Sequence, residues 1–275
     1  MTRIRVFAAL AMAPAAIAAV LLLPTPWLML VVAILFLGAL WEWFALAEVE
    51  DSLARSALLV LNLMLMVALV WGTGGTAATL VLFKLAVVLG VVWWLLSMLW
   101  LVHYDFASDH DTHARVFKLA AGTFAVVPAW CALALLHNDG PGWLLLALFI
   151  VWGTDTGAYF AGRAFGKRKL APRISPNNTV AGLVGGATLG VLVAVAGAWF
   201  LLGSTASQLP LVALVALLAV LFSVVGDLFE SLLKRHVGVK DSGNLIPGHG
   251  GIMDRADSVL AALPVFALGK IWLGF

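Results

Sequence analysis

Long apolar runs recur along the whole of this 275-residue chain. Each is close to the ~20 residues that an α-helix needs to cross the roughly 30 Å hydrocarbon core of a bilayer. Backbone polar groups in lipid must be satisfied within the segment, so these runs predict helices rather than isolated strands. The sequence therefore predicts an all-α, polytopic integral membrane protein with about nine transmembrane helices, at residues 6–23, 27–46, 56–72, 79–102, 115–136, 142–164, 180–202, 208–229 and 257–274.

Composition supports the same class. Only 11% of the residues are charged and 63% are hydrophobic, which leaves too few charges to cover a soluble globule. Arg3 and Arg5 precede an apolar run, a pattern shared with signal peptides. We expect a retained first helix instead, because the rest of the chain is membrane-embedded. The single Cys131 lies within an apolar run and is expected to pack there without a chemical role.

Basic residues are distributed unevenly between alternate loops. With the N-terminus inside, the outer loops 24–26, 73–78, 137–141 and 203–207 contain no Lys or Arg. Cytoplasmic loops of membrane proteins are enriched in both residue types. The pattern predicts a protein of the cell (inner) membrane whose polar loops face the cytoplasm. The basic residues of the inner loops are Arg55, Lys167, Arg168, Lys169, Arg173, Lys234, Arg235, Lys240 and Arg255.

The chain is expected to form one integral-membrane unit, residues 1–275, with a helical scaffold at 1–102. Apart from Lys84, Glu42 and the short loop 48–56, that scaffold offers little chemistry, and Trp41 and Trp43 flank Glu42. Two roles stay open for Glu42: an anchor in the interfacial aromatic belt, or part of the lining of a polar site. The loop 103–115 holds three His and three Asp, but without a metal-ligand spacing, so we expect a solvated loop.

Chemistry is expected in three segments of the C-terminal half. In the first, Asp155, Tyr159 and Arg163 follow at i, i+4 and i+8, so on a helix they share one face. A carboxylate in an apolar helix is costly and normally faces a protein interior or an aqueous cavity. We expect Asp155 to bind substrate; the alternative is an interhelical tie between Asp155 and Arg163.

The second segment runs from 167 to 186, where four basic residues precede Ser-Pro-Asn-Asn-Thr and a Gly-rich helix start. Hydroxyl, amide and backbone N–H groups at a helix N-terminus form a natural phosphate site. The same residues are also ordinary turn and cap residues. The candidate substrate-binding residues here are Lys167, Ser175, Asn178 and Thr179.

The third segment, 226–258, is the most polar part of the chain. Asp227, Glu230, Ser231 and Lys234 share a helix face, and Asp254, Asp257 and Ser258 repeat the 0, +3, +4 spacing at the next helix start. Carboxylates on two facing helix ends suit Mg²⁺, which takes oxygen ligands and completes its shell with phosphate. The alternative is a salt-bridged loop that caps both helices. Lys240, Asp241 and His249 lie between the two helices.

The stretch SLLKRHVGVKDSGNLIPGHGGIMDRAD (231–257) closely resembles the signature of the phosphatidate cytidylyltransferases, also called CDP-diacylglycerol synthases. DTGAYFAGRAFGK and SPNNT resemble two further blocks of that family in the same order, so the resemblance spans a catalytic region at about 150–260. Two positions depart from the pattern. Ala256 replaces a larger apolar residue, and Asn178 stands where the family usually has Lys. Lys167, Lys169 and Arg173 are the candidates to supply the missing charge.

The resemblance implies transfer of CMP from CTP to phosphatidic acid in the lipid bilayer, giving CDP-diacylglycerol and pyrophosphate. It implies Mg²⁺, as one ion or two, held by Asp227 and Asp254, with Asp241 and Asp257 as weaker candidates. Ser231 and Lys240 join the substrate-binding set, a homodimer is an open option, and no nucleic-acid partner is expected. The implied catalytic residues are Asp227, Lys234, Arg235, Asp241, His249, Asp254 and Arg255.

Two rival functions stay open at this point. A CTP-dependent lipid kinase would use similar basic and acidic groups but would transfer the γ-phosphate. An ion-coupled transporter could use the intramembrane Asp155 and helices broken by glycine. Against a transporter, the charges gather at one membrane face, and the two halves contain no paired broken helices.

Overall fold

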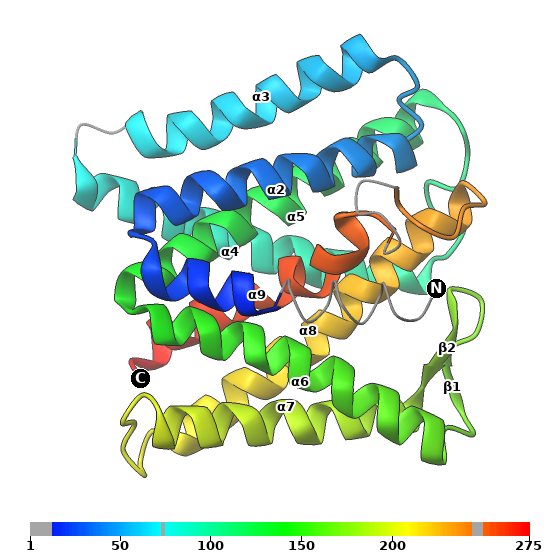
Figure 1. Cartoon of the computed structure of the whole chain (residues 1–275). Helices are drawn as coiled ribbons and strands as arrows, with labels where there is room; N and C mark the ends of the chain where they lie inside the picture. The colour runs from blue at the N-terminus through cyan, green and yellow to red at the C-terminus, as the bar shows by residue number, and fades with distance from the viewer. Residues whose placement is uncertain (1–12, 73–74, 244–249) are drawn as a thin grey trace.

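The computed structural model describes residues 13–72, 75–243 and 250–275 and is almost entirely helical (Figure 1). Within these ranges eight helices are long and apolar enough to cross a membrane, and a shorter apolar helix, Ala13–Leu22, precedes them. The predicted all-α polytopic architecture is confirmed, although the start of the first predicted span lies outside the described residues. The long helices are α2 (Thr25–Leu46), α3 (Ser52–Trp71), α4 (Thr76–Val102), α5 (Thr112–Asp139), α6 (Pro141–Phe165), α7 (Val180–Phe200), α8 (Leu209–His236) and α9 (Met253–Leu273).

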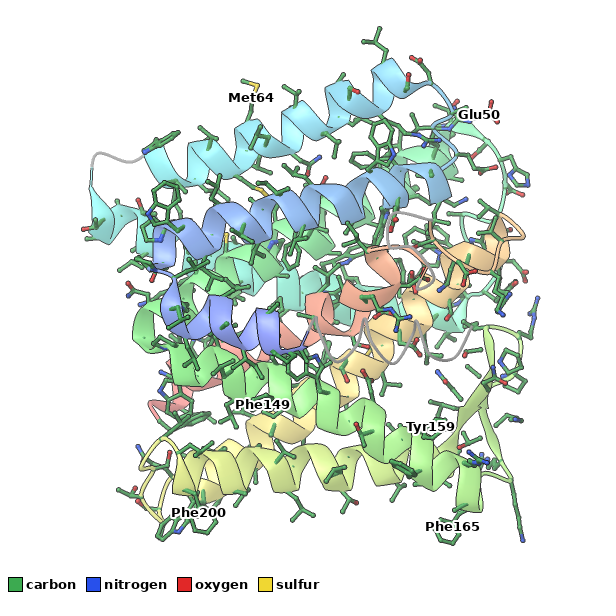
Figure 2. The ribbon with its side chains drawn as sticks, in the orientation of Figure 1. Glu50, Met64, Phe149, Tyr159, Phe165 and Phe200 are labelled. Atoms are coloured by element: carbon green, nitrogen blue, oxygen red, sulfur yellow. The ribbon has the colours of Figure 1, made fainter. Side chains whose placement is uncertain are left out.

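Helix α5 forms the centre of the bundle, and α3 lies at its margin. Most of α5 is buried, and it packs against α2, α4, α6 and α9. In α3 only Asn62 and Met66 are buried, and Met64 points away from the bundle (Figure 2). In a membrane this apolar outer surface meets lipid, so its exposure has no solvation cost.

An aromatic cluster holds the end of α8 in place. Phe229 is fully buried, with ring centroids 5.8 Å from Trp93, 6.0 Å from Trp94 and 5.2 Å from Trp100 on α4. Trp43 of α2 stacks on the same ring at 6.0 Å. Edge-to-face and stacked aromatic pairs stabilise beyond the area that they bury. This packing fixes the turn of α8 that also presents its acidic residues.

Helices α6 and α7 pack closely along a face of small residues. A Cβ atom on Gly157 would lie 2.5 Å from the carbonyl oxygen of Gly185, so only glycine permits this approach. The two helices are joined by an antiparallel hairpin of β1 (Lys169–Ala171) and β2 (Ser175–Thr179). The sequence indicated only a turn and a helix cap here; the structure adds the hairpin to the predicted all-helical fold.

The hairpin is held against the bundle from two directions. The Arg173 guanidinium lies 4.2 Å from the centre of the Tyr104 ring and pairs with Asp105 at 3.2 Å. Arg235 Nε of α8 donates to the carbonyl of Ile174 at 3.1 Å. The hairpin, the end of α6 and the end of α8 therefore gather at one end of the bundle, opposite the C-terminus (Figure 1).

Candidate active site

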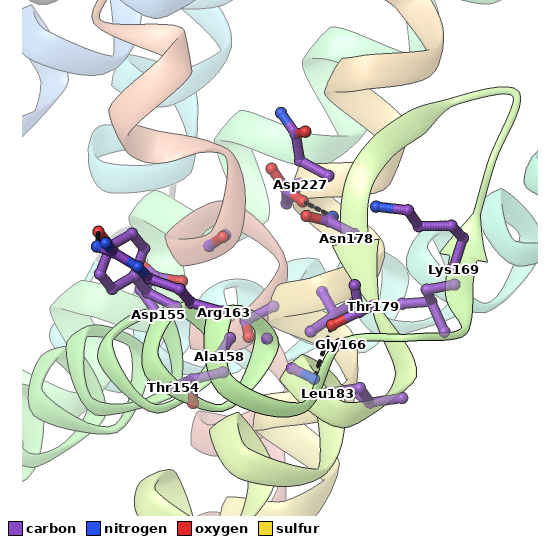
Figure 3. Close-up of a pocket in the computed structure, with 18 residues that line it drawn as sticks. Thr154, Asp155, Ala158, Arg163, Gly166, Lys169, Asn178, Thr179, Leu183 and Asp227 are labelled. Atoms are coloured by element: carbon purple, nitrogen blue, oxygen red, sulfur yellow. Dashed lines mark hydrogen bonds between the residues drawn. The ribbon is translucent and has the colours of Figure 1, made fainter.

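A cavity of about 610 Å³ opens where α6, α7, α8 and the hairpin meet (Figure 3). Asp155, Tyr159 and Arg163 of α6 line one side of it, which confirms that their spacing places them on a shared face. Arg163 Nη1 donates to the Tyr159 hydroxyl at 3.1 Å. The other lining residues are Thr154, Ala158, Gly162, Gly166, Lys169, Leu170, Asn177, Asn178, Thr179, Gly182, Leu183, Ser223, Val224, Asp227 and Ser258.

The hairpin and the start of α7 contribute the polar groups on the opposite side. Asn178 Nδ2 donates to Asp227 Oδ2 at 2.7 Å, which ties β2 to α8 across the cavity (Figure 3). The Thr179 hydroxyl accepts from Gly182 N at 3.0 Å and so caps α7. The partial positive charge of this helix N-terminus favours an anion in the cavity.

Three basic residues are candidates for the positive charge that Asn178 lacks, and Lys169 lies at the cavity. It begins β1, pairs in register with Thr179 and extends toward the cavity (Figure 3). Lys167 is exposed just before β1 and is not among the described residues that line the cavity. Arg173 is engaged by Tyr104 and Asp105 at the far end of the hairpin. Of the three candidates, only Lys169 lines the cavity.

A second polar network joins the end of α8 to the start of α9. Lys234 Nζ lies 2.7 Å from Glu230 Oε2 and 2.7 Å from Asp254 Oδ1. Asp254 also accepts from the backbone N–H groups of Ser242, at 3.1 Å, and Gly251, at 2.8 Å. Glu230 and Lys234 therefore lie on one face of α8, as predicted, and Asp254 of α9 pairs with the same lysine.

Asp257 lies between the cavity and this network. A Cβ on Gly226 would sit 2.4 Å from the Asp257 carbonyl oxygen, so α8 and α9 touch at this point. The side chain of Asp257 is buried, and its Oδ1 accepts from Ser258 N at 2.6 Å. The charges of Asp155, Asp227 and Glu230 all act on it. Asp257 thus has acidic neighbours on both α6 and α8.

The remaining predicted residues that the structure describes do not line the cavity. Arg235 is directed to the hairpin carbonyl of Ile174, and Ser231 is buried within α8. Arg255, in the first turn of α9, is exposed, and its charge acts on Asp155. Ser175 begins β2, half-buried, opposite Ala171. Lys240 and Asp241 are exposed after α8, whereas His249 lies outside the described residues.

The predicted Mg²⁺ site can be compared with these groups. In the described part of the chain, no three Asp, Glu, His or Cys side chains converge closely enough to hold an ion unaided. Mg²⁺ commonly takes only one or two carboxylates and completes its shell with water and phosphate. Asp227 fits that use, because it lines the cavity and Asn178 engages only one of its oxygens. Both oxygens of Asp254 already accept hydrogen bonds.

Fold and site together define an α-helical membrane protein with a cavity near one end of its bundle. Asp155, Asp227, Lys169 and the N-terminus of α7 line this cavity. The profile of the cytidylyltransferase family matches residues 3–271 of the chain. A phosphatidate cytidylyltransferase of Pseudomonas aeruginosa is 39% identical over 270 residues, covering 97% of this chain and 96% of the relative. One from Haemophilus influenzae is 32% identical over 281 residues, covering 97% and 98%. The chain belongs to the cytidylyltransferase family.

A further relative matches over a shorter stretch. The phosphatidate cytidylyltransferase of Bacillus subtilis is 46% identical over 133 residues, or 47% of each chain. Together with the longer matches, this confirms the resemblance that the 231–257 signature predicted.

Proposed function

We propose that this protein transfers CMP from CTP to phosphatidic acid, giving CDP-diacylglycerol and pyrophosphate. The observation that carries the proposal is the cavity in which Lys169, the capped N-terminus of α7 and Asp227 face one another. A cation and helix N–H groups suit a triphosphate, and a neighbouring carboxylate suits its metal ion. The names of the long relatives, both phosphatidate cytidylyltransferases, support the same substrates.

The chemistry requires alignment and charge neutralisation more than a protein nucleophile. An oxygen of the phosphatidate phosphate forms a bond to the α-phosphorus of CTP while the bond from that phosphorus to the β-phosphate oxygen breaks. Pyrophosphate leaves with the electron pair of that bond. Because the attacking phosphate is already a nucleophile, no covalent enzyme intermediate is needed.

Several residues in and beside the cavity would contribute to that alignment. Lys169 and the start of α7 would hold the triphosphate, with Asn178 and Thr179 as polar contacts. Lys234, fixed by Glu230 and Asp254, would neutralise charge that develops on the phosphates. Arg255, whose charge reaches Asp155, would hold the phosphate of the lipid.

Mg²⁺ would be held by Asp227, with Asp257 next to it and Asp254 as the remaining predicted ligand. A bound ion supplies charge screening between the two phosphate substrates and polarises the phosphoryl oxygens. The protein's own contribution is to place Asp227 rigidly, through the Asn178 hydrogen bond and the aromatic packing of Phe229.

The site would face the cytoplasm, because its end of the bundle carries the basic loops. CTP is then available from the aqueous side and phosphatidate from the adjacent leaflet. A homodimer remains a separate prediction, which the mass of the protein in detergent or nanodiscs would test.

One labelling experiment separates this function from its rivals. Purified protein in phosphatidate vesicles, with CTP labelled at the α-phosphate, should give a labelled lipid, whereas γ-labelled CTP should release labelled pyrophosphate. A lipid kinase would give the opposite result, with lipid labelled from the γ position only. If neither label reaches lipid and the vesicles instead accumulate ions, the protein is a transporter.

A further inference from the structure

Glu42 of α2 is buried against the segment that carries the family signature, about 200 residues away in sequence from the groups that it contacts. Its side chain is 3% exposed. Oε2 accepts a hydrogen bond from Met253 N at 2.9 Å and from the Ser242 hydroxyl at 3.2 Å. A helix of the predicted scaffold therefore reaches into the segment that carries the family signature.

The backbone on both sides of these contacts lies directly against the carboxylate. A Cβ atom on Gly243 would overlap Glu42 Oε1, and one on Gly251 would overlap Oε2. Only glycine at both positions allows such an approach. The carboxylate thus lies between two stretches of chain, Ser242–Gly243 and Gly251–Met253.

Glu42 also completes the start of α9. Ile252, at the N-cap of α9, offers no side-chain hydrogen bond, so the helix has no cap of its own. The Met253 N–H, one of the first four of the helix, is satisfied by Glu42 instead. A negative charge at a helix N-terminus is stabilising, which offsets part of the cost of burying the carboxylate.

Asp254 also forms hydrogen bonds with the two stretches of chain that contact Glu42. It accepts from the backbone N–H groups of Ser242 and Gly251 while it pairs with Lys234. Ser242 and Gly251 are therefore held between two carboxylates, Glu42 from α2 and Asp254 from α9. Glu42 and Asp254 therefore contact the same stretches of backbone, and Asp254 connects them to Lys234.

From this geometry we infer that Glu42 is a positioning residue for the transfer reaction: it fixes Ser242 and the start of α9, and thereby the Asp254–Lys234 pair. The inference rests on the proposed function for the reaction that Glu42 supports, whereas the contacts of Glu42 are independent of that function. Glu42 does not line the described cavity, so it acts through other residues. Its Oε1 has no hydrogen-bond partner among the described residues, which leaves the hold on Ser242 and Met253 to Oε2.

The test compares Glu42→Gln with Glu50→Gln, a matched change at an exposed carboxylate after the same helix (Figure 2). Gln keeps the size of the side chain and removes its charge. Loss of charge-assisted hydrogen bonds should lower kcat about tenfold or more, with KM for CTP and phosphatidate nearly unchanged. Glu50→Gln should match the wild type.

Amide hydrogen exchange on the intact protein without substrate supplies an independent readout. In Glu42→Gln, exchange at Ser242 and Met253 should be about tenfold faster, with the other helices unchanged. Ser242→Ala removes one donor and leaves Glu42 charged, so it should give a smaller loss of kcat. Because the two residues share one contact, the double variant should lose less than the product of the single losses.

Three results would overturn the inference: wild-type kcat in Glu42→Gln, faster exchange throughout the bundle, or strictly multiplicative losses in the double variant. Since exchange needs no turnover, its outcome stands apart from that of the proposed function. A wild-type protein that makes no CDP-diacylglycerol would disprove the function while still showing whether Glu42 holds Ser242 and Met253.

Discussion

The side-chain amide of Asn178 on β2 donates a 2.7 Å hydrogen bond to Asp227 Oδ2 on α8. The two residues are 49 positions apart. Their contact closes one side of the cavity and joins the proposed triphosphate-binding hairpin to the proposed metal-binding carboxylate. Nucleotide and metal would therefore bind next to each other, so a change at Asn178 or at Asp227 should affect the binding of both ligands.

Replacing the carboxylate of Asp227 should abolish turnover. Asp227→Asn keeps the shape of the side chain but removes the charge that would hold Mg²⁺, leaving the phosphates unscreened. We expect a variant that still inserts and purifies but gives no labelled lipid from α-labelled CTP. Asp109→Asn, at an exposed loop position, serves as the control. Near-normal activity in Asp227→Asn would remove this residue from the metal site.

Introducing Lys at position 178, where the resemblance in sequence leads one to expect it, should strengthen CTP binding. In Asn178→Lys an ammonium replaces an amide beside Asp227 and the cavity. A charge-assisted contact to phosphate is worth about 1.5–3 kcal/mol, so the apparent KM for CTP should fall roughly tenfold. The KM for phosphatidate should change less. The opposite pattern, with only phosphatidate affected, would assign this position to the lipid.

Two neighbouring lysines on the hairpin side should differ in importance. Both are exposed, but only Lys169 lines the cavity. Lys169→Ala should raise the apparent KM for CTP about tenfold through loss of a cation near the triphosphate. Lys167→Ala, the matched control, should leave it unchanged. Steady-state assays over a series of CTP concentrations measure both KM values. Equal effects of the two changes would indicate that Lys169 acts only through the general positive charge of this surface.

Membrane sidedness can be tested with single cysteines after replacement of the buried Cys131. Val239, after α8, and Ser207, between α7 and α8, are both exposed. In oriented membranes an impermeant thiol reagent should label Val239→Cys from the cytoplasmic side and Ser207→Cys from the other side, as the basic loops predict. Labelling of both from one side would contradict the orientation.

Glu48, between α2 and α3, should make the fold sensitive to acid. Partial burial acts to raise its pKa, but the 2.5 Å hydrogen bond with His110 and the charge of the buried Lys118 outweigh this and lower the pKa below its usual 4.5. A lowered pKa stabilises the fold above that usual value and ceases to do so as the pH falls through the folded value.

The variant that tests this is Glu48→Gln, in which the buried Lys118 loses its ion-pair partner. At neutral pH it should lower the free energy of unfolding by about 1–3 kcal/mol. Thermal unfolding in detergent between about pH 3 and pH 7 should show the difference from wild type shrinking toward the acid end. A difference independent of pH would show that the pair does not titrate as argued.

Some features of this protein follow from the sequence because they are local. The length and hydropathy of each apolar run decide whether a helix can cross a bilayer, and the spacing of Asp155, Tyr159 and Arg163 decides that they share a face. The 231–257 signature is also read directly along the chain. For these reasons the helical membrane architecture and the family could be predicted without the structure.

Other features depend on which helices meet, and spacing along the chain does not contain that information. Lys167 and Lys169 look equivalent in sequence, yet only the hairpin register brings Lys169 to the cavity. Arg235 could be placed in the catalytic set from the sequence, but its Nε contact with the Ile174 carbonyl appears only in the structure. Glu42 could be assigned only as an anchor or a site residue until α2 was seen against Ser242 and Met253. Such contacts arise from the close packing of distant helices, so only the tertiary structure decides them.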